Sequence, residues 1–74
     1  MNKNDIYEEL REQSLEDVYN VLCKNEPTKN SKRHLIWDDL ESIAYEELLE
    51  EEEHPNECTR IINMIVDYLK MISK

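Results

Sequence analysis

The chain contains no glycine among its 74 residues, and this absence restricts its fold more than any other feature. Glycine enters left-handed backbone conformations freely, and tight β-hairpin turns and glycine-rich phosphate loops both depend on it. Helices joined by polar loops remain as the expected architecture. Apolar residues make up 39% of the chain and recur with helical periodicity, which indicates a folded protein.

Three amphipathic segments predict an all-α fold, a small three-helix bundle in a single domain of residues 1–74. A chain of this length is near the size at which one core gives only a few kcal/mol of net stability, so a second copy or a partner would help it. The helices are expected over approximately residues 5–23, 31–53 and 55–73.

Local signals set the ends of these helices. We prefer a single first helix that runs to about Cys23, although residues 14–17 have the form of a capping box that could restart or bend it. Pro27 lies in a polar first loop. Pro55 can occupy the first turn of the third helix, because no amide hydrogen is needed at that position.

The second and third helices are expected to supply much of the core. The second carries one apolar stripe with Trp37 at its margin. The third is the most apolar, and its face is broader than two short helices need to cover, so it is a candidate for homodimerisation or for docking a partner helix. The stripe of the second helix is Ile36, Leu40, Ile43, Ala44 and Leu48, and the candidate dimer or partner-helix face is Ile61, Ile65, Leu69 and Ile72.

Two patterns of metal ligands are present but incomplete. Glu51 and His54 form one E-x-x-H, whereas di-iron bundles need this motif twice together with two more glutamates. Cys23, His34, His54 and Cys58 are of the right types for zinc, but zinc modules bring their ligands in close pairs and these spacings are poor. We therefore expect no metal and no cofactor, with both cysteines as buried thiols rather than a disulfide.

Several function classes are disfavoured. Both cysteines fall on apolar helical faces of a protein too small for a deep cleft, so we do not expect an enzyme. The 18 acidic and 9 basic residues give a net charge of -9, which repels phosphate backbones and argues against direct nucleic-acid binding. No long apolar span or signal-peptide core is visible, so we expect no membrane contact and a cytoplasmic location.

The stretch from Leu35 to Cys58 holds ten acidic residues and no lysine or arginine. Surface helices usually intersperse the two signs, because opposite charges at i and i+4 add stability whereas like charges at that spacing remove it. The acidic side chains of this segment therefore repel one another, and this repulsion lowers the stability of the helix. Its acids are Asp38, Asp39, Glu41, Glu46, Glu47, Glu50, Glu51, Glu52, Glu53 and Glu57.

One interpretation is that these acids meet a basic protein surface, such as one that normally holds DNA or RNA. Carboxylates at i and i+4 lie roughly 5–6 Å apart, so a row of them approaches the charge density of one nucleic-acid strand. The competing interpretation is a solvated face kept for solubility. The predicted partner-binding residues are Asp38, Asp39, Glu46, Glu47, Glu50, Glu51 and Glu53, with Trp37 and Tyr45 as anchors.

Two function hypotheses follow. The first is a small acidic inhibitor or neutraliser of a basic partner, such as a phage or mobile-element nucleic-acid mimic, an anti-defence protein, an antitoxin or an immunity protein. Electrostatic steering would bring such a module to its target quickly. The alternative is a structural or regulatory module that acts by homodimerisation or hydrophobic helix docking through the third helix. Strong salt dependence of binding would favour the first hypothesis, and salt-insensitive association the second.

Overall fold

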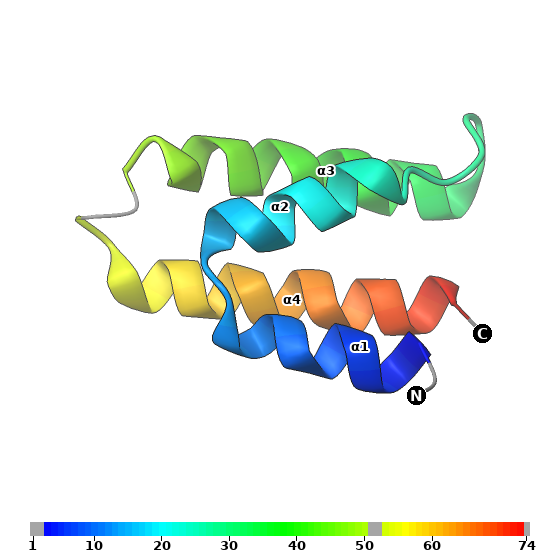
Figure 1. Ribbon diagram of the computed structural model, residues 1–74. Coiled ribbons are helices and arrows are strands. Elements are labelled where there is room, and N and C mark those ends of the chain that lie inside the picture. The colour runs from blue at the N-terminus through cyan, green and yellow to red at the C-terminus, as the bar shows by residue number, and fades with distance from the viewer. Residues whose placement is uncertain (1–2, 51–52, 74) are drawn as a thin grey trace.

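The computed structural model describes residues 3–50 and 53–73 and confirms the all-α fold (Figure 1). Its described part contains helices and no strand. The helix α4 lies between α3 and α1, and α2 lies in front of α3 and contacts both α3 and α4 (Figure 1). The elements in chain order are α1 (Lys3–Glu9), the short 3-10 helix η1 (Leu10–Glu12), α2 (Leu15–Lys24), α3 (Lys32–Leu48) and α4 (Pro55–Ile72).

The preference for one continuous first helix is wrong, because the chain breaks at Gln13 and Ser14. The backbone of Ser14 is extended, and its Oγ accepts a hydrogen bond from the amide of Asp17 at 3.2 Å. This is the N-cap geometry that satisfies a free amide in the first turn of a helix. The capping signal of residues 14–17 therefore marks a true restart, which lets α1 and η1 pack on α4 while α2 packs on both α3 and α4.

We expect Ser14→Ala to destabilise the fold by about 1 kcal/mol, since the Asp17 amide loses its acceptor at the start of α2. Urea denaturation followed by circular dichroism measures this change. Ser42→Ala, at an exposed position within α3, is the matched control and should stay within about 0.5 kcal/mol of the unmodified protein. Equal stability of the two variants would show that the Ser14 cap does not hold α2 in place.

The boundaries of the later helices differ slightly from the expectation. Ser31 caps α3, and its Oγ accepts from the amide of His34 at 3.1 Å. The helix α3 ends at Leu48 rather than near residue 53, with no basic residue in its last turn. Acids at a helix C-terminus oppose the helix dipole, which explains the earlier end. The helix α4 begins with Pro55 in its first turn, as expected.

The core gathers around α4, as the apolar character of the third segment indicates. This helix contributes half of the twelve buried apolar residues among those that the structure describes, with α2 and α3 supplying the remainder from two sides. The hydroxyl of Tyr68 donates to the carbonyl of Arg33 at 2.6 Å and so ties α4 to the start of α3. The buried residues are Leu15, Val18, Leu22, Trp37, Leu40, Ala44, Ile61, Ile62, Ile65, Val66, Tyr68 and Leu69.

The predicted apolar stripe of the second helix is rotated relative to the observed one. Ile36 and Ile43 are 46% and 43% exposed, whereas Trp37, placed at the margin, is only 8% exposed. The indole Nε1 of Trp37 donates to the carbonyl of Leu22 at 2.8 Å. Trp37 thus joins α3 to the end of α2, where the Leu22 carbonyl also accepts from the amide of Asn25 at 3.1 Å.

The candidate dimer face on α4 is also corrected. Ile61, Ile65 and Leu69 are at most 3% exposed within a single chain, and Ile72 packs partly buried against the same core. The prediction underestimated the cover that this face receives, because the break at Ser14 turns one expected helix into two packing elements. These side chains therefore have almost no surface left to offer a second copy.

Cys23 and Cys58 form no disulfide, but the predicted burial is wrong for Cys23 and only partly met by Cys58, which packs against the core. Cys23 is exposed, and Cys58 is intermediate in exposure. In α2 the buried positions are Leu15, Val18 and Leu22, and one residue further along a helix turns the side chain by about 100°, toward solvent. Cys23 therefore does not belong to the apolar stripe of its neighbour Leu22.

An ion-pair network holds the first helix on α4. The guanidinium of Arg11 lies 2.8 Å from carboxylate oxygens of both Glu8 and Asp67, and it donates to Asn63 Oδ1 at 2.8 Å. Lys70 also pairs with Glu8. Hydrogen bonds from Arg11, and then from Lys70, lower the pKa of Glu8 from 4.5 to about 2.

This pKa shift predicts an acid-sensitive contribution to stability. The folded-state pKa of Glu8 lies below its ordinary value, so the stabilisation is complete above pH 4.5 and is lost as the pH falls toward 2. The melting temperature of Glu8→Gln should lie below that of the unmodified protein at pH 7, and the difference should vanish near pH 2. Glu9→Gln is the control, and a pH-independent difference for Glu8→Gln would contradict the assignment.

Candidate protein-binding surface

Helix α3 and its C-cap residue Leu49 expose large apolar side chains to solvent. Leu35, Tyr45 and Leu49 are 66%, 53% and 72% exposed. Positions seven and three or four residues apart share one side of a helix, so these side chains lie along one line with acidic residues between them. We call this surface the outer face of α3, and it consists of Leu35, Asp38, Asp39, Ser42, Tyr45, Glu46 and Leu49.

The structure separates the predicted acidic residues into three groups. Asp38, Asp39 and Glu46 are exposed on the outer face of α3. Glu50 and Glu53 are exposed beyond the end of that helix. The side chain of Glu47 is only 15% exposed, and Glu51 lies outside the described residues.

Of the two predicted anchors, only Tyr45 is presented to solvent. Its ring lies against Tyr19 of α2, with 6.4 Å between the ring centroids. The hydroxyl of Tyr19 donates to Glu41 at 2.6 Å, and this hydrogen bond raises the pKa of Tyr19. Trp37 lies in the core and stacks on His34, so the folded protein does not present it to a partner.

Few acids of the described residues pair with lysine or arginine, and none of the predicted set is among them. The basic groups Arg11, Arg60 and Lys70 pair with Glu8, Asp67 and Glu57, on α1 and α4. Within the described residues, no ion pair with lysine or arginine forms to the six described acids of the predicted set; histidine is the only basic side chain near any of them. These six are Asp38, Asp39, Glu46, Glu47, Glu50 and Glu53.

The tertiary fold adds acids that the sequence pattern did not include. The connection between η1 and α2 lies at the same end of the molecule as the turn between α3 and α4 (Figure 1). This brings the exposed Glu12, Glu16 and Asp17 to the end that carries Glu50 and Glu53. The opposite end holds the first loop, with Lys24, Lys29, Lys32 and Arg33 at or near it. The protein therefore has an acidic end and a basic end.

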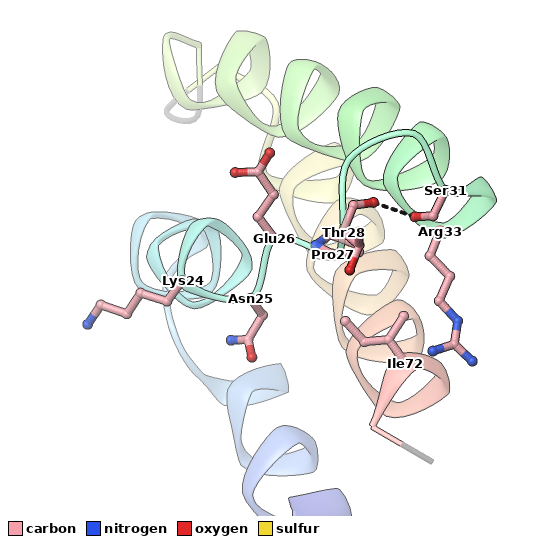
Figure 2. A pocket seen from close by; sticks show the side chains of 8 residues that line it. All are labelled: Lys24, Asn25, Glu26, Pro27, Thr28, Ser31, Arg33 and Ile72. Atoms are coloured by element: carbon pink, nitrogen blue, oxygen red, sulfur yellow. Dashed lines mark hydrogen bonds between the residues drawn. The ribbon is translucent and has the colours of Figure 1, made fainter.

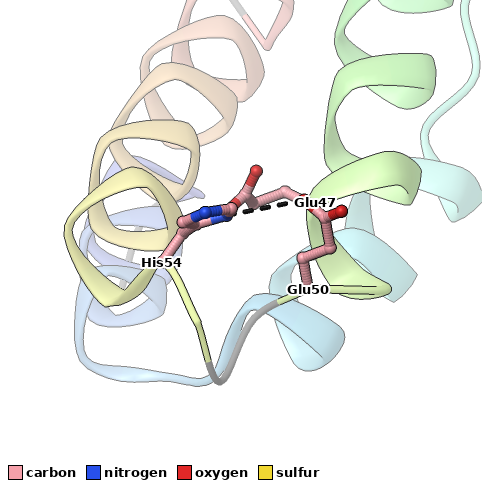
Figure 3. Close-up of side chains that lie close together, drawn as sticks. All are labelled: Glu47, Glu50 and His54. Carbon is pink, nitrogen blue, oxygen red and sulfur yellow. Dashed lines mark ion pairs between the residues drawn. The ribbon is translucent and has the colours of Figure 1, made fainter.

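One group of side chains at the acidic end has the composition of a metal site. Ligand atoms of Glu47, Glu50 and His54 all lie within 4.8 Å of one another, and Figure 3 shows both carboxylates directed toward the imidazole across the turn. His54 Nδ1 is 3.2 Å from Glu47 Oε1 and 3.5 Å from Glu50 Oε2, and these contacts are ion pairs when His54 is protonated. Glu47 Oε1 is buried and lacks a well-aligned hydrogen bond from the described residues.

This group differs from both metal patterns considered in the sequence. The E-x-x-H partner of His54 is Glu51, which lies outside the described residues. Of the four zinc-type residues, His34 binds Glu26 at 2.7 Å and stacks on Trp37 instead. Carboxylates and imidazole suit divalent metals, but a protonated His54 between two carboxylates accounts for the same arrangement without an ion.

Two surface hollows are present among the described residues. One, of about 530 Å³, borders the first loop (Figure 2). Lys24 and Arg33 point away from each other there, and the hydroxyl of Ser31 donates to the carbonyl of Thr28 (Figure 2). The other, of about 360 Å³, is a shallow apolar groove between α3 and α4 that includes Ile36, Met64 and Met71.

Known protein families, curated proteins and solved structures yield no match to this chain. The described helices include none that is both long and apolar enough to cross a membrane. The outer face of α3 combines exposed apolar side chains with exposed acids. Leu35 and Leu49 were missed in the sequence because periodicity alone does not show which apolar residues exceed the needs of the core. Their spacing of seven residues on either side of Ser42 was the available signal.

Proposed function

We propose that the protein is a small acidic inhibitor or neutraliser that binds a basic protein partner through α3, in the cytoplasm and without catalysis. The observation that carries this proposal is the coincidence of two features on one helix. The six described acids of the predicted partner-binding set have no lysine or arginine partner in the described chain, and three large apolar side chains beside them are more than half exposed. The charges would speed the association with a basic partner, and the apolar side chains would slow the dissociation of the complex.

The position of the acids on α3 supports a functional origin. Glu46 and Glu47 lie in the last turn of α3, where the helix dipole is negative and where the chain supplies no basic residue. Each such acid opposes helix stability by a few tenths of a kcal/mol at an exposed position. A face kept only for solubility could carry its acids at helix N-termini, as Glu16 and Asp17 do at α2. A basic partner would relieve the repulsion on binding.

The subclasses considered for an acidic inhibitor all remain within this proposal: a nucleic-acid mimic, an anti-defence protein, an antitoxin or an immunity protein. A module that dimerises through α4 is less well supported, because Ile61, Ile65 and Leu69 are buried within one chain. Direct binding of nucleic acid is disfavoured by the net charge of -9.

The test compares partner capture by the unmodified protein with capture by Asp38→Asn, Asp39→Asn and Glu46→Gln combined. Neutral isosteric changes remove charge and keep shape. We expect a basic protein to be retained at 50 mM salt, released near 500 mM, and retained at least tenfold less by the variant, because exposed charges act over a salt-dependent range.

The matched control neutralises three exposed acids away from α3, by Glu9→Gln, Glu12→Gln and Glu16→Gln. This variant has the same net charge as the first but keeps the outer face of α3. Equal retention of the partner by both variants and by the unmodified protein would mean that the acids of α3 serve solubility alone.

A further inference from the structure

The apolar residues on the outer face of α3 follow the spacing of a coiled-coil seam. Leu35, Ser42 and Leu49 are seven residues apart, and Asp38 and Tyr45 follow the first two of them by three. These are the a and d positions of a heptad, the pattern by which one helix packs along another; three of the five are apolar, and Asp38 and Ser42 are the polar ones. Asp39 and Glu46 then occupy the flanking e positions, whose charges select the partner helix.

We propose that the element bound by the outer face of α3 is a basic amphipathic α-helix of the partner, packed lengthwise along Leu35, Tyr45 and Leu49. This inference rests on the proposed function and specifies the binding mode. The seam from Leu35 to Leu49 is roughly 21 Å long at 1.5 Å per residue, so about four turns of a partner helix cover it. Lysine or arginine at the partner's flanking positions meets Asp39 and Glu46.

The charges on this face distinguish such a partner from a second copy of the chain. The seam and its flank carry Asp38, Asp39 and Glu46 and no basic residue. Two copies packed through this face would set like charges against one another in either orientation, and like charges across such a seam destabilise it. A basic helix instead sets lysine or arginine beside Asp39 and Glu46 while its leucines cover the exposed apolar side chains.

The groove between α3 and α4 is a weaker site for the same helix. Its apolar residues Ile36 and Met64 are 46% and 38% exposed, less than Leu35 or Leu49. Its one acidic lining residue, Asp67, already pairs with Arg11 at 2.8 Å. The outer face of α3 is therefore richer both in exposed apolar surface and in acids without a lysine or arginine partner.

The test uses a designed 21-residue peptide with leucine at a and d and lysine at e and g, together with a peptide of identical composition in scrambled order. Binding is measured by titration calorimetry at 150 mM salt. We expect the heptad peptide to bind at least tenfold more tightly than the scrambled one, and to gain helical circular dichroism in the complex. Equal binding by the two peptides would mean that charge alone attracts them. The proposed helix-packing mode would then be wrong, while the proposed binding of a basic partner would stand.

Protein variants locate the site. Leu35→Ala with Leu49→Ala should weaken binding of the heptad peptide at least tenfold and leave the circular dichroism of the free protein unchanged, because both side chains are largely exposed. Ile36→Ala with Met64→Ala is the matched control in the groove, and a larger loss there would overturn the assignment. Concentration-dependent dimerisation that Leu35→Ala with Leu49→Ala abolishes would identify a second copy as the occupant and overturn it also.

The same titration separates this inference from the proposed function. Neutralising Asp38, Asp39 and Glu46 should weaken the peptide at least tenfold and flatten the salt dependence. The neutralised variant could bind the peptide as tightly as the unmodified protein, while Leu35→Ala with Leu49→Ala bound it weakly. The acids would then contribute nothing to binding, and the proposed function would be wrong. Loss in both variants supports both proposals.

Discussion

Trp37→Ala is expected to destabilise the fold by about 3–5 kcal/mol, as removal of a large buried aromatic side chain does. A domain of this size has only a few kcal/mol of net stability, so much of the variant should be unfolded at 25 °C. The reason is structural: Trp37 is 8% exposed, donates to the Leu22 carbonyl at 2.8 Å and stacks on His34. Far-ultraviolet circular dichroism with urea denaturation measures the loss.

Trp37→Phe separates packing from hydrogen bonding. Phenylalanine keeps most of the buried apolar area and removes the indole donor, so this variant should lose about 1–3 kcal/mol, less than alanine. A Trp37→Ala protein that kept its full helical signal and urea midpoint but lost its partner would contradict this expectation. It would restore the sequence-based interpretation of Trp37 as a surface anchor.

Ile65→Ala is expected to destabilise the fold by about 2–5 kcal/mol, and by the same amount at every protein concentration. Ile65 has no exposed surface within one chain, so its loss leaves a cavity in the core rather than a gap at an interface. A dimer interface would behave differently, since its unfolding midpoint depends on the concentration of chains.

Met64→Ala is the control on the same helix, because Met64 is 38% exposed. It should change the free energy of unfolding by less than about 1 kcal/mol. Thermal melts of all three proteins at concentrations from 5 to 500 µM test the expectation. The melting temperature of the unmodified protein could instead rise with protein concentration, while that of Ile65→Ala did not. That result would show that α4 is a dimer face.

The fold class and most of the helical extent could be predicted from the sequence, because local signals determine them. Apolar periodicity and the absence of glycine indicated helices, and Pro55 marked the start of the last one. The break at Ser14 was signalled by the capping box but not chosen. The cap gives only about 1 kcal/mol, and the gain that favours the break is the packing of η1 and α1 on α4, which the sequence does not display.

The face of α3 was beyond prediction for a different reason. This helix carries apolar residues on several sides, among them Leu35, Ile36, Trp37 and Leu40 in close succession. Periodicity identifies an inward face only when the other faces are polar. The large side chain of Trp37 faces the core and donates a hydrogen bond to Leu22, and this contact sets which side of α3 faces inward. The contact depends on the position of α2.

The candidate site was predictable in its charge but not in its shape. The run of acids without lysine or arginine is visible in the sequence, and the outer face of α3 exposes Asp38, Asp39 and Glu46 as expected. The apolar members Leu35 and Leu49 became visible only when the core was known to be complete without them. Glu47 illustrates the reverse case, because the turn before His54 draws it into partial burial.

The separation of an acidic end from a basic end makes the whole molecule an electric dipole. The 17 residues of α3 span roughly 25 Å at 1.5 Å per residue, about three times the screening distance in physiological salt. A positively charged target would therefore exert a torque on the approaching protein and turn its acidic end forward before contact. Such pre-orientation requires no movement within the folded chain.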